Sequence, residues 1–218
     1  MLFLLPAGSF AQGDTKKNTT EKESIFSFKG FSISTDLFGY AYSMIEDYIS
    51  GEVAIEANFG NKFYPVFEAG YGSSDVTDDI FGIHYKSSAP YYRVGVNYNF
   101  TNKTGESPRP NYIFGAARFG WTRAKYDVSA PPITDPVWGG SVSLDLIDVE
   151  NYYSWMELGA GVKVKIWKNL NMGWCIRYKV RLNQTSGNNS RIWYVPGFGN
   201  SRHTTWGGTY SIIYDIPL

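Results

Sequence analysis

The sequence SGEVAIEANFGNKFYPVFEAGYG, residues 50–72, contains the clearest structural signal in the chain. Apolar residues alternate with other residues on both sides of a turn at residues 60–62. A period of two is that of a β-strand, and two such runs around a glycine-asparagine turn predict a hairpin. Pro65 has no N–H for the ladder, so we expect a bulge or local distortion there. An apolar face that points inward would indicate a soluble β-protein. An apolar face that points outward would indicate a membrane protein whose surroundings are lipid.

The same alternation recurs along the chain and gives eight runs of 9–16 residues. Strands in soluble proteins average about 5–6 residues, whereas transmembrane strands need about 9–11. The length of the runs therefore favours strands that cross a membrane. The eight runs are Gly30–Tyr42, Gly51–Phe59, Lys62–Ser73, Ala89–Phe100, Asn111–Tyr126, Tyr152–Trp167, Asn171–Asn183 and Thr204–Ile216.

The connections between the runs alternate in length. The shorter ones are Gly60–Asn61, Thr101–Pro110 and Lys168–Leu170. The longer ones are Ser43–Ser50, Ser74–Ser88, Asp127–Asn151 and Gln184–His203. Short turns at one end and longer loops at the other are typical of bacterial outer-membrane barrels. An even number of strands places both chain ends at the short-turn end.

The two faces of the runs differ in composition. One face is apolar, and its aromatic residues gather near the ends of the runs, as in the girdles of membrane barrels. The other face carries the charged residues and most of the glycines, including Gly70 and Gly72. Glycine weakens a strand, but a crowded interior needs it to leave room for long charged side chains. The sequence therefore predicts an all-β fold, an eight-stranded antiparallel up-and-down transmembrane β-barrel with a polar, side-chain-filled interior.

The charged side chains of the polar face are expected to form a salt-bridge network, because an isolated charge in a low-dielectric interior is very costly. If Leu170 lies in its hairpin turn, Glu157 lies opposite Arg181, and directly opposite residues on one face interact. We interpret the network as structural rather than as a gate or proton path. Its predicted members are Asp36, Glu56, Glu68, Arg93, Arg118, Glu157, Lys163, Arg177, Lys179, Arg181 and Asp215.

The composition argues against several classes of protein. The formal net charge of the 218 residues is zero, so no basic excess indicates a nucleic-acid partner. No apolar run approaches the roughly 18–20 residues of a transmembrane helix. Cys175 is the only cysteine, which excludes a disulfide framework and a cysteine-based metal site, and we expect it to be buried and inert. We expect no cofactor and no metal site.

The first residues look like the end of a targeting segment. Met1 to Leu5 is apolar, and the sequence Ser-Phe-Ala at 9–11 resembles the small-x-small cleavage site of a secretory signal. The residues that follow are polar. We predict the remnant of a signal peptide at 1–11, a polar periplasmic leader at 12–28 and the barrel domain at 29–218.

In run length, loop asymmetry and the composition of its faces, the chain resembles the small eight-stranded outer-membrane β-barrels of Gram-negative bacteria, of the OmpA/OmpX kind. Tyr210, Ile212, Tyr214 and Ile216 look like the C-terminal assembly signal of that superfamily, which usually closes on an aromatic residue, whereas this chain ends on Leu218. The resemblance implies an uncharacterised member family in the bacterial outer membrane. It also implies contact with outer-membrane lipids, and with the barrel-assembly machinery through the last strand.

The function is less constrained than the fold. The interior of an eight-stranded barrel is just wide enough for side chains to fill, so a wide solute pore is not expected. We expect a structural or surface-interaction role, in which the outer loops bind an extracellular ligand or protein. One alternative is a soluble periplasmic ligand-binding barrel of the lipocalin kind.

The other alternative is a rim enzyme that modifies lipid A or phospholipid. Its general base would be His84 or His203, both in predicted outer loops. The loop of His84 also carries two acids and two serines, Asp78, Asp79, Ser87 and Ser88.

The predicted outer loops also carry aromatic residues. They belong either to an exposed binding surface or to the upper interfacial belt of the barrel. These residues are Trp138, Trp193, Tyr194 and Phe198.

Overall fold

The computed structural model describes residues 27–42, 48–101, 110–134, 139–186, 193–200 and 202–216. Eight long strands form the body of the molecule, one short helix follows the first of them, and two very short strands precede the last. The elements are β1 (Phe28–Asp36), α1 (Leu37–Tyr42), β2 (Tyr48–Phe59), β3 (Phe63–Thr77), β4 (His84–Asn99), β5 (Tyr112–Thr134), β6 (Ser141–Trp167), β7 (Leu170–Ser186), β8 (Tyr194–Val195), β9 (Gly199–Asn200) and β10 (Thr204–Ile216).

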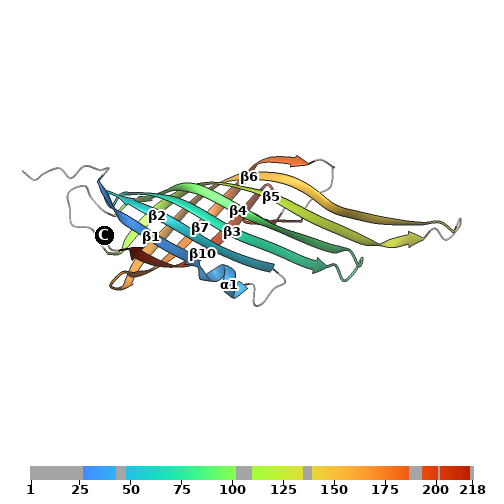
Figure 1. The fold of residues 1–218 in the computed structure, drawn as a ribbon, viewed down its shortest axis with the longest axis horizontal. Helices are drawn as coiled ribbons and strands as arrows, with labels where there is room; N and C mark the ends of the chain where they lie inside the picture. The colour runs from blue at the N-terminus through green and yellow to red at the C-terminus, as the bar shows by residue number, and fades with distance from the viewer. Residues whose placement is uncertain are drawn as a thin grey trace, which may run out of the picture.

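The eight long strands close into a barrel in the order β1-β10-β7-β6-β5-β4-β3-β2 (Figure 1). Every neighbouring pair is antiparallel, and the ring closes where β1 pairs with β10, for example at Ser32 opposite Asp215. The predicted eight-stranded antiparallel barrel is confirmed.

The barrel is apolar outside and polar inside. Exterior side chains such as Ile55, Leu158 and Ile176 are 49%, 62% and 64% exposed. Charged side chains such as Glu68 and Arg93 are each 2% exposed and point into the barrel. Because this order is the reverse of a protein dissolved in water, the exterior fits hydrocarbon, and the lipocalin-like alternative is wrong. None of the helices in the described ranges is long and apolar enough to cross a membrane.

Aromatic side chains on the exterior gather at two levels. One group lies near the rim that carries the Gly60-Asn61 turn, which we call the inner rim, and it comprises Phe28, Phe31, Phe59, Phe63, Tyr98 and Phe100. The other lies toward the opposite end, the outer rim, and comprises Phe67, Tyr92, Phe119, Trp121, Tyr178 and Trp206. Two aromatic girdles of this kind mark the membrane-water interfaces of transmembrane barrels.

The turn between β2 and β3, at residues 60–62, begins with two residues of positive φ. Gly60 and Asn61 have φ angles of 59° and 56°, and Lys62 donates its N–H to the carbonyl oxygen of Phe59 at 3.1 Å. Positive φ at both central residues is characteristic of a type I′ turn, which explains the glycine-asparagine pair. Because β1 begins opposite Phe59 and β10 ends beside β1, both ends of the described barrel lie at the inner rim.

The predicted bulge at Pro65 is absent. The β2-β3 pairing passes from Glu56 opposite Val66 to Phe59 opposite Phe63 without a change of register. Pro65 interrupts the paired positions on that side, and it remains opposite Val96 of β4 on the other side. The expected local distortion is therefore present as two missing pairs of the ladder, although the register is kept.

Several predicted boundaries were wrong at the outer rim. The first run ends at Asp36, and the residues predicted as its continuation form α1. The predicted loops at 74–88 and 127–151 are mostly strand, because β3 pairs with β4 up to Thr77 opposite His84, and β5 pairs with β6 up to Thr134 opposite Ser141. In the β3-β4 extension one face stays buried at Ser74, Tyr85 and Ser87, whereas most of the β5-β6 extension is exposed. Small and polar residues on these strands made the apolar period hard to recognise.

Some predictions lie outside the described residues. The proposed signal peptide at 1–11 and nearly all of the polar leader at 12–28 fall in residues 1–26. Trp138 is also outside the described ranges.

Candidate functional site: a filled interior and a cavity at the outer rim

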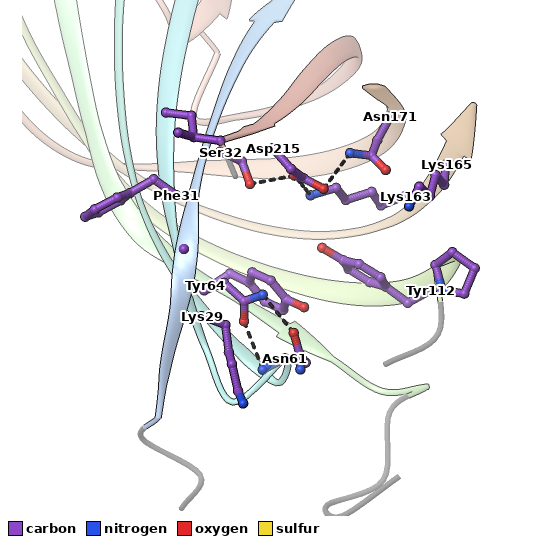
Figure 2. Close-up of a pocket in the computed structure, with 14 residues that line it drawn as sticks. Lys29, Phe31, Ser32, Asn61, Tyr64, Tyr112, Lys163, Lys165, Asn171 and Asp215 are labelled. Carbon is purple, nitrogen blue, oxygen red and sulfur yellow. Dashed lines mark hydrogen bonds and ion pairs between the residues drawn. The ribbon is translucent and has the colours of Figure 1, made fainter. Parts of the chain in front are cut away.

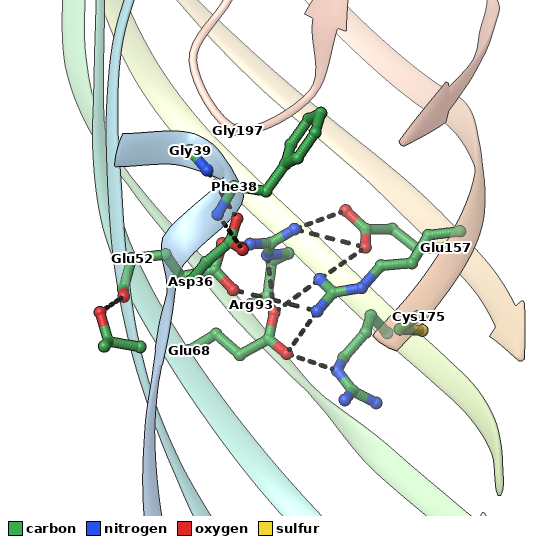
Figure 3. Close-up of polar contacts among 12 residues, drawn as sticks. Asp36, Phe38, Gly39, Glu52, Glu68, Arg93, Glu157, Cys175 and Gly197 are labelled. Carbon is green, nitrogen blue, oxygen red and sulfur yellow. Dashed lines mark hydrogen bonds and ion pairs between the residues drawn. The ribbon is translucent and has the colours of Figure 1, made fainter. Parts of the chain in front are cut away.

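Buried ion pairs fill the middle of the barrel (Figure 3). Nε of Arg93 lies 2.8 Å from Glu68 Oε2, and Nη1 of Arg93 lies 3.2 Å from Glu157 Oε1. Nη1 of Arg177 lies 3.0 Å from Glu68 Oε2 and 3.3 Å from Glu157 Oε2. Two arginines thus bridge the same two carboxylates. The central ion network comprises these four residues with Glu52, Arg118 and Lys179.

The barrel register places these groups together. Glu68 lies opposite Arg93 in the β3-β4 pair, and Glu157 lies opposite Arg118 in the β5-β6 pair and Lys179 in the β6-β7 pair. Each residue is at an inward position of its strand, so the closed ring brings six strands to one level.

Neutral donors complete the network. Trp155 donates its indole N–H to Glu157 Oε1 at 2.7 Å, and Tyr91 donates its hydroxyl to Glu52 Oε2 at 3.0 Å. Arg118 also donates to the side-chain oxygen of Asn97 at 2.8 Å. Such bonds reduce the cost of desolvating the charges, because buried charges require both ion pairing and hydrogen bonding.

A second polar cluster lies toward the inner rim (Figure 2). Lys163 Nζ donates to Asp215 at 3.1 Å, and the same carboxylate accepts from the hydroxyl of Ser32 and the amide of Asn171, each at 2.8 Å. Lys163 also lies 3.8 Å from Glu56. A cavity of about 280 Å³ opens toward the inner rim, and it is bordered by Ser32, Lys163, Asn171 and Asp215.

The segment from Trp193 to Asn200, which we call the plug, folds into the outer mouth of the barrel. Val195 and Phe198 are 0% and 2% exposed, and the Phe198 ring packs edge-on against Trp155 with centroids 5.9 Å apart. Lys179 Nζ donates to the carbonyl oxygen of Gly197 at 2.8 Å. The φ angle of Gly197 is 80°, and a side chain there would overlap the Tyr91 ring. This glycine thus permits both the turn and the close approach.

Between the plug, the central ion network and β10 lies a cavity of about 750 Å³, which we call the outer cavity. It shares no lining residue with the inner cavity, and the central ion network lies between them. Its lining combines ionisable groups with aromatic rings. The residues used below are Asp36, Glu52, Arg93, Lys179, Trp193 and Trp206.

The predicted network residues occupy four places. Glu68, Arg93, Arg118, Glu157, Arg177 and Lys179 belong to the central ion network, and Glu56, Lys163 and Asp215 belong to the inner cluster. Asp36 instead accepts the N–H groups of Phe38, Gly39 and Tyr210. Arg181 is half-buried at the outer end of β7, where its backbone N–H donates to His203. Glu52 was absent from the predicted network, although its inward position could have indicated it.

The predicted pairing of Glu157 with Arg181 was wrong. Trp167 pairs with Leu170 across a turn at Lys168, and an irregularity between Lys165 and Trp167 shifts the register. Arg181 consequently lies opposite Trp155.

The interior glycines make room for different side chains from those expected. A Cβ at Gly70 would overlap the ring of Tyr91, and a Cβ at Gly72 would lie 3.0 Å from Pro196 of the plug. Gly95 does adjoin a charged side chain, since its Cβ would lie 2.6 Å from Cδ of Arg118. The upper interior is therefore more aromatic than the charged residues alone suggest.

The loop aromatics also differ from prediction. Phe198 is neither an exposed residue nor part of the interfacial belt, because it is a buried residue of the plug. Tyr194 is half-buried, and Trp193 is exposed and stacks on Tyr85. Cys175 is buried, as expected.

The two histidines do not form a shared site. His84 is the first residue of β4, with Nδ1 3.0 Å from the Thr77 hydroxyl and Nε2 3.5 Å from Asp75. His203 precedes β10, and β5, β6 and β7 separate β4 from β10 in the ring. Asp78 accepts the N–H groups of the two turn residues at positions 80 and 81.

The other predicted companions of His84 do not assemble around it. Ser87 is buried, while Asp79 is exposed. The described residues contain no group of three or more His, Cys, Asp or Glu side chains suited to hold a metal ion.

The chain belongs to the family described as Domain of unknown function (DUF6048). The model of that family matches residues 1–218. No curated protein matches the chain.

Three solved structures are similar to this chain. Neisserial surface protein A (NspA) is 11% identical, with 87% of this chain and 99% of that chain covered and a TM-score of 0.48. A major outer membrane protein from Thermus thermophilus is 14% identical, with 85% and 98% covered and a TM-score of 0.49. Ail, the attachment invasion locus protein of Yersinia pestis, solved with the heparin analogue sucrose octasulfate, is 11% identical, with 86% and 98% covered and a TM-score of 0.41. Nothing in these similarities singles out the OmpA/OmpX kind.

Proposed function

We propose that this protein is an outer-membrane β-barrel that holds a strand ribbon outside the cell as a docking element for another protein. The ribbon consists of Lys125–Thr134 of β5 and Ser141–Glu150 of β6, which pair with each other. In Figure 1 this hairpin extends well beyond the other strands. The length of the ribbon is the observation that carries the proposal.

The ribbon is longer than a membrane requires. A transmembrane strand needs about 9–11 residues, and β6 has 27. The surplus of about 16 residues corresponds to roughly 50 Å of strand at about 3.3 Å per residue. Such a projection has no use in bracing the barrel wall, whereas it suits contact with a partner at a distance from the lipid surface.

The ribbon also has an open edge. β7 pairs with β6 only as far as Asn151, so the β6 residues 141–150 have no second neighbouring strand in the described part of the chain. Their backbone groups can accept a further strand, as in recognition by β-strand addition. Val142 and Ile147 are 73% and 76% exposed along this strand and would contact the added segment.

Charges on the ribbon indicate the character of the partner. Lys125 donates to Asp148 at 2.8 Å, which raises the pKa of Lys125, and Arg123 pairs with Glu150. The remaining acids, Asp127 and Asp145, leave an acidic surplus. An extended basic segment is therefore the complementary partner.

The presentation of the ribbon can be tested on intact cells. An Ile147→Cys variant should react with a membrane-impermeant maleimide, because this side chain is exposed on the ribbon. An Asn169→Cys variant, in the inner turn, should react only after the outer membrane is permeabilised. Labelling of both variants in intact cells would refute the orientation. The single native cysteine, Cys175, is buried and provides the background control.

The docking role is tested by shortening the ribbon. Residues 127–148 are replaced by Asn-Gly, which joins Tyr126 to Val149 across a two-residue hairpin turn; these two residues already pair. The barrel should still show heat-modifiable migration in detergent gels. Cells carrying the shortened form should lose cell-to-cell aggregation and adherence to matrix proteins relative to cells with the full chain. Equal aggregation and adherence of the two strains would overturn the docking role.

A further inference from the structure

The barrel wall is incomplete on its outer half, between β2 and β10. β1 pairs with β10 only as far as Asp36 opposite Ser211, and with β2 only as far as Thr35 opposite Val53. Beyond these pairs, β10 residues 204–210 and β2 residues 48–52 have no neighbouring strand on that side in the described part of the chain. We call this gap the window. The helix α1 lies in it and contacts both strands.

The helix packs closely against the β2 side of the window. An added Cβ at Gly39 would lie 2.9 Å from the carbonyl oxygen of Ser50, and one at Gly51 would lie 3.1 Å from the Tyr40 ring. An added Cβ at Gly208 of β10 would meet nothing within 4 Å in the described residues. Because Gly208 lies opposite the exposed Ile176, this free space is on the exterior face of β10, beside the window.

The β10 edge presents backbone groups to this opening. The backbone N–H of Tyr210 donates to Asp36 at 3.0 Å. The backbone groups of Tyr210 therefore face the window. Because backbone groups of alternate residues point to the same side of a strand, those of Gly208 and Trp206 also face the window. Backbone groups at membrane depth require hydrogen-bonding partners, since each unsatisfied group costs several kcal/mol in hydrocarbon.

The window connects the surrounding lipid with the outer cavity. Residues 206–216 of β10 number about 11, the length of one transmembrane strand, so the window lies at the level of the outer leaflet. Trp206 and Phe38, which line the cavity, are 71% and 53% exposed and continue the lipid-facing surface of the barrel. An occupant can therefore have its polar part in the cavity and its apolar part in the bilayer.

The cavity lining indicates the chemistry of the polar part. The charges of its ionisable residues balance, and each of these residues has partners. Arg93 pairs with Glu52, and Asp36 accepts three N–H groups. Lys179 donates to two plug carbonyl oxygens. Two acids and two bases leave no net charge to attract an anion. Hydroxyl groups both donate and accept, so they can satisfy the β10 edge without adding charge.

We propose that the window and the outer cavity bind one outer-leaflet glycolipid, with its neutral, hydroxyl-rich sugar head group in the cavity and its acyl chains against the barrel exterior. The exposed rings of Trp193 and Trp206 border the head group, and the backbone of Gly208 contacts it. This binding site is independent of the ribbon and stands whether or not the ribbon docks a protein.

The test uses the full chain in nanodiscs. The discs contain dioleoylphosphatidylcholine with equal small fractions of monoglucosyl diacylglycerol and dioleoylphosphatidylglycerol, and native mass spectrometry counts the lipids retained on the ejected barrel. We expect one glucosyl lipid per barrel. Gly208→Trp should reduce its retention at least tenfold by covering the exterior side of the window, where a Cβ at this position has free space. Ala160→Trp, at an exposed exterior position on β6, is the matched control and should retain it.

Three outcomes would overturn the proposal. The first is preferential retention of phosphatidylglycerol. The second is retention of no lipid, which means that water fills the cavity. The third is equal retention of the glucosyl lipid by the two tryptophan variants. Heat-modifiable migration verifies that each variant is folded. If Gly208→Trp does not fold, Trp193→Ala replaces it, and undiminished glucosyl lipid on that variant would equally exclude the site.

Discussion

Replacing Glu157 by glutamine tests the central ion network directly. The side chain of Glu157 is 0% exposed, and it contacts Arg93, Arg177 and Lys179. The network holds three carboxylates and four cations, so the substitution leaves two carboxylates for four cations. Glutamine keeps the size of the side chain and an acceptor for the Trp155 N–H, which is 2.7 Å away. The loss of charge is thus separated from the loss of packing.

The expected cost follows from burial. Removing one partner of a buried ion pair costs about 3–5 kcal/mol, because the remaining charges stay desolvated. We expect about 3 kcal/mol for Glu157→Gln, and about 5 kcal/mol for Glu157→Ala, which also leaves a cavity. Glu150→Gln is the matched control on the same strand. Its pair with Arg123 is at the surface, with the two side chains 36% and 73% exposed, so its loss should cost about 0–1 kcal/mol.

The assay is equilibrium unfolding by urea in lipid vesicles, followed by tryptophan fluorescence and by heat-modifiable migration. The free energies of unfolding of Glu157→Gln and Glu150→Gln are compared with that of the unsubstituted chain. Equal free energies for the two variants would refute the reasoning, since the interior pairs would then contribute no more than surface pairs. A changed denaturant slope would instead indicate that the variant unfolds from a different folded state.

Gly70→Ala should destabilise the barrel by about 1–3 kcal/mol in the same unfolding assay, because its Cβ overlaps an aromatic ring, whereas Gly208→Ala, which meets open space, should leave the stability unchanged. Equal values for the two alanine variants would argue against the packing described. Phe198→Ala should release the plug without unfolding the barrel, and limited proteolysis of barrels in vesicles should show new cleavage between residues 193 and 200; an unchanged cleavage pattern would contradict this. Replacing His84 and His203 together by alanine should leave the envelope lipids unchanged by mass spectrometry, because the two imidazoles share no site, and altered lipids would support the rim-enzyme alternative.

The sequence predicts the barrel itself well, because strands that separate lipid from a polar interior carry a strong period of two. Leu158 and Glu157 show this on adjacent positions, one 62% and the other 1% exposed. Register was less predictable, since the turn that pairs Trp167 with Leu170 and an irregularity near Lys165 together moved Glu157 away from Arg181. Local alternation cannot reveal such a shift, which depends on how the turn closes.

The outer half was predicted poorly for two physical reasons. Most of the ribbon beyond Tyr126 is exposed, and its prolines, serines and aspartates are typical of a loop. The plug depends on contacts that the sequence does not place side by side, such as Phe198 with Trp155 and Gly197 with Tyr91. The window has no local signal at all, because it arises where β1 stops pairing and α1 begins.

The plug has a consequence for the order in which the barrel assembles. The β1-β10 pair joins residues about 180 positions apart, so it has the largest loop-closure cost and is expected to form last. The plug ends only a few residues before Thr204, where β10 starts. Pairing of β10 with β1, which completes the ring, therefore also places the plug in the outer mouth of the barrel. Before the ring closes, the arginines and glutamates of the interior face are exposed to water. Closure of the ring therefore also desolvates these charged side chains.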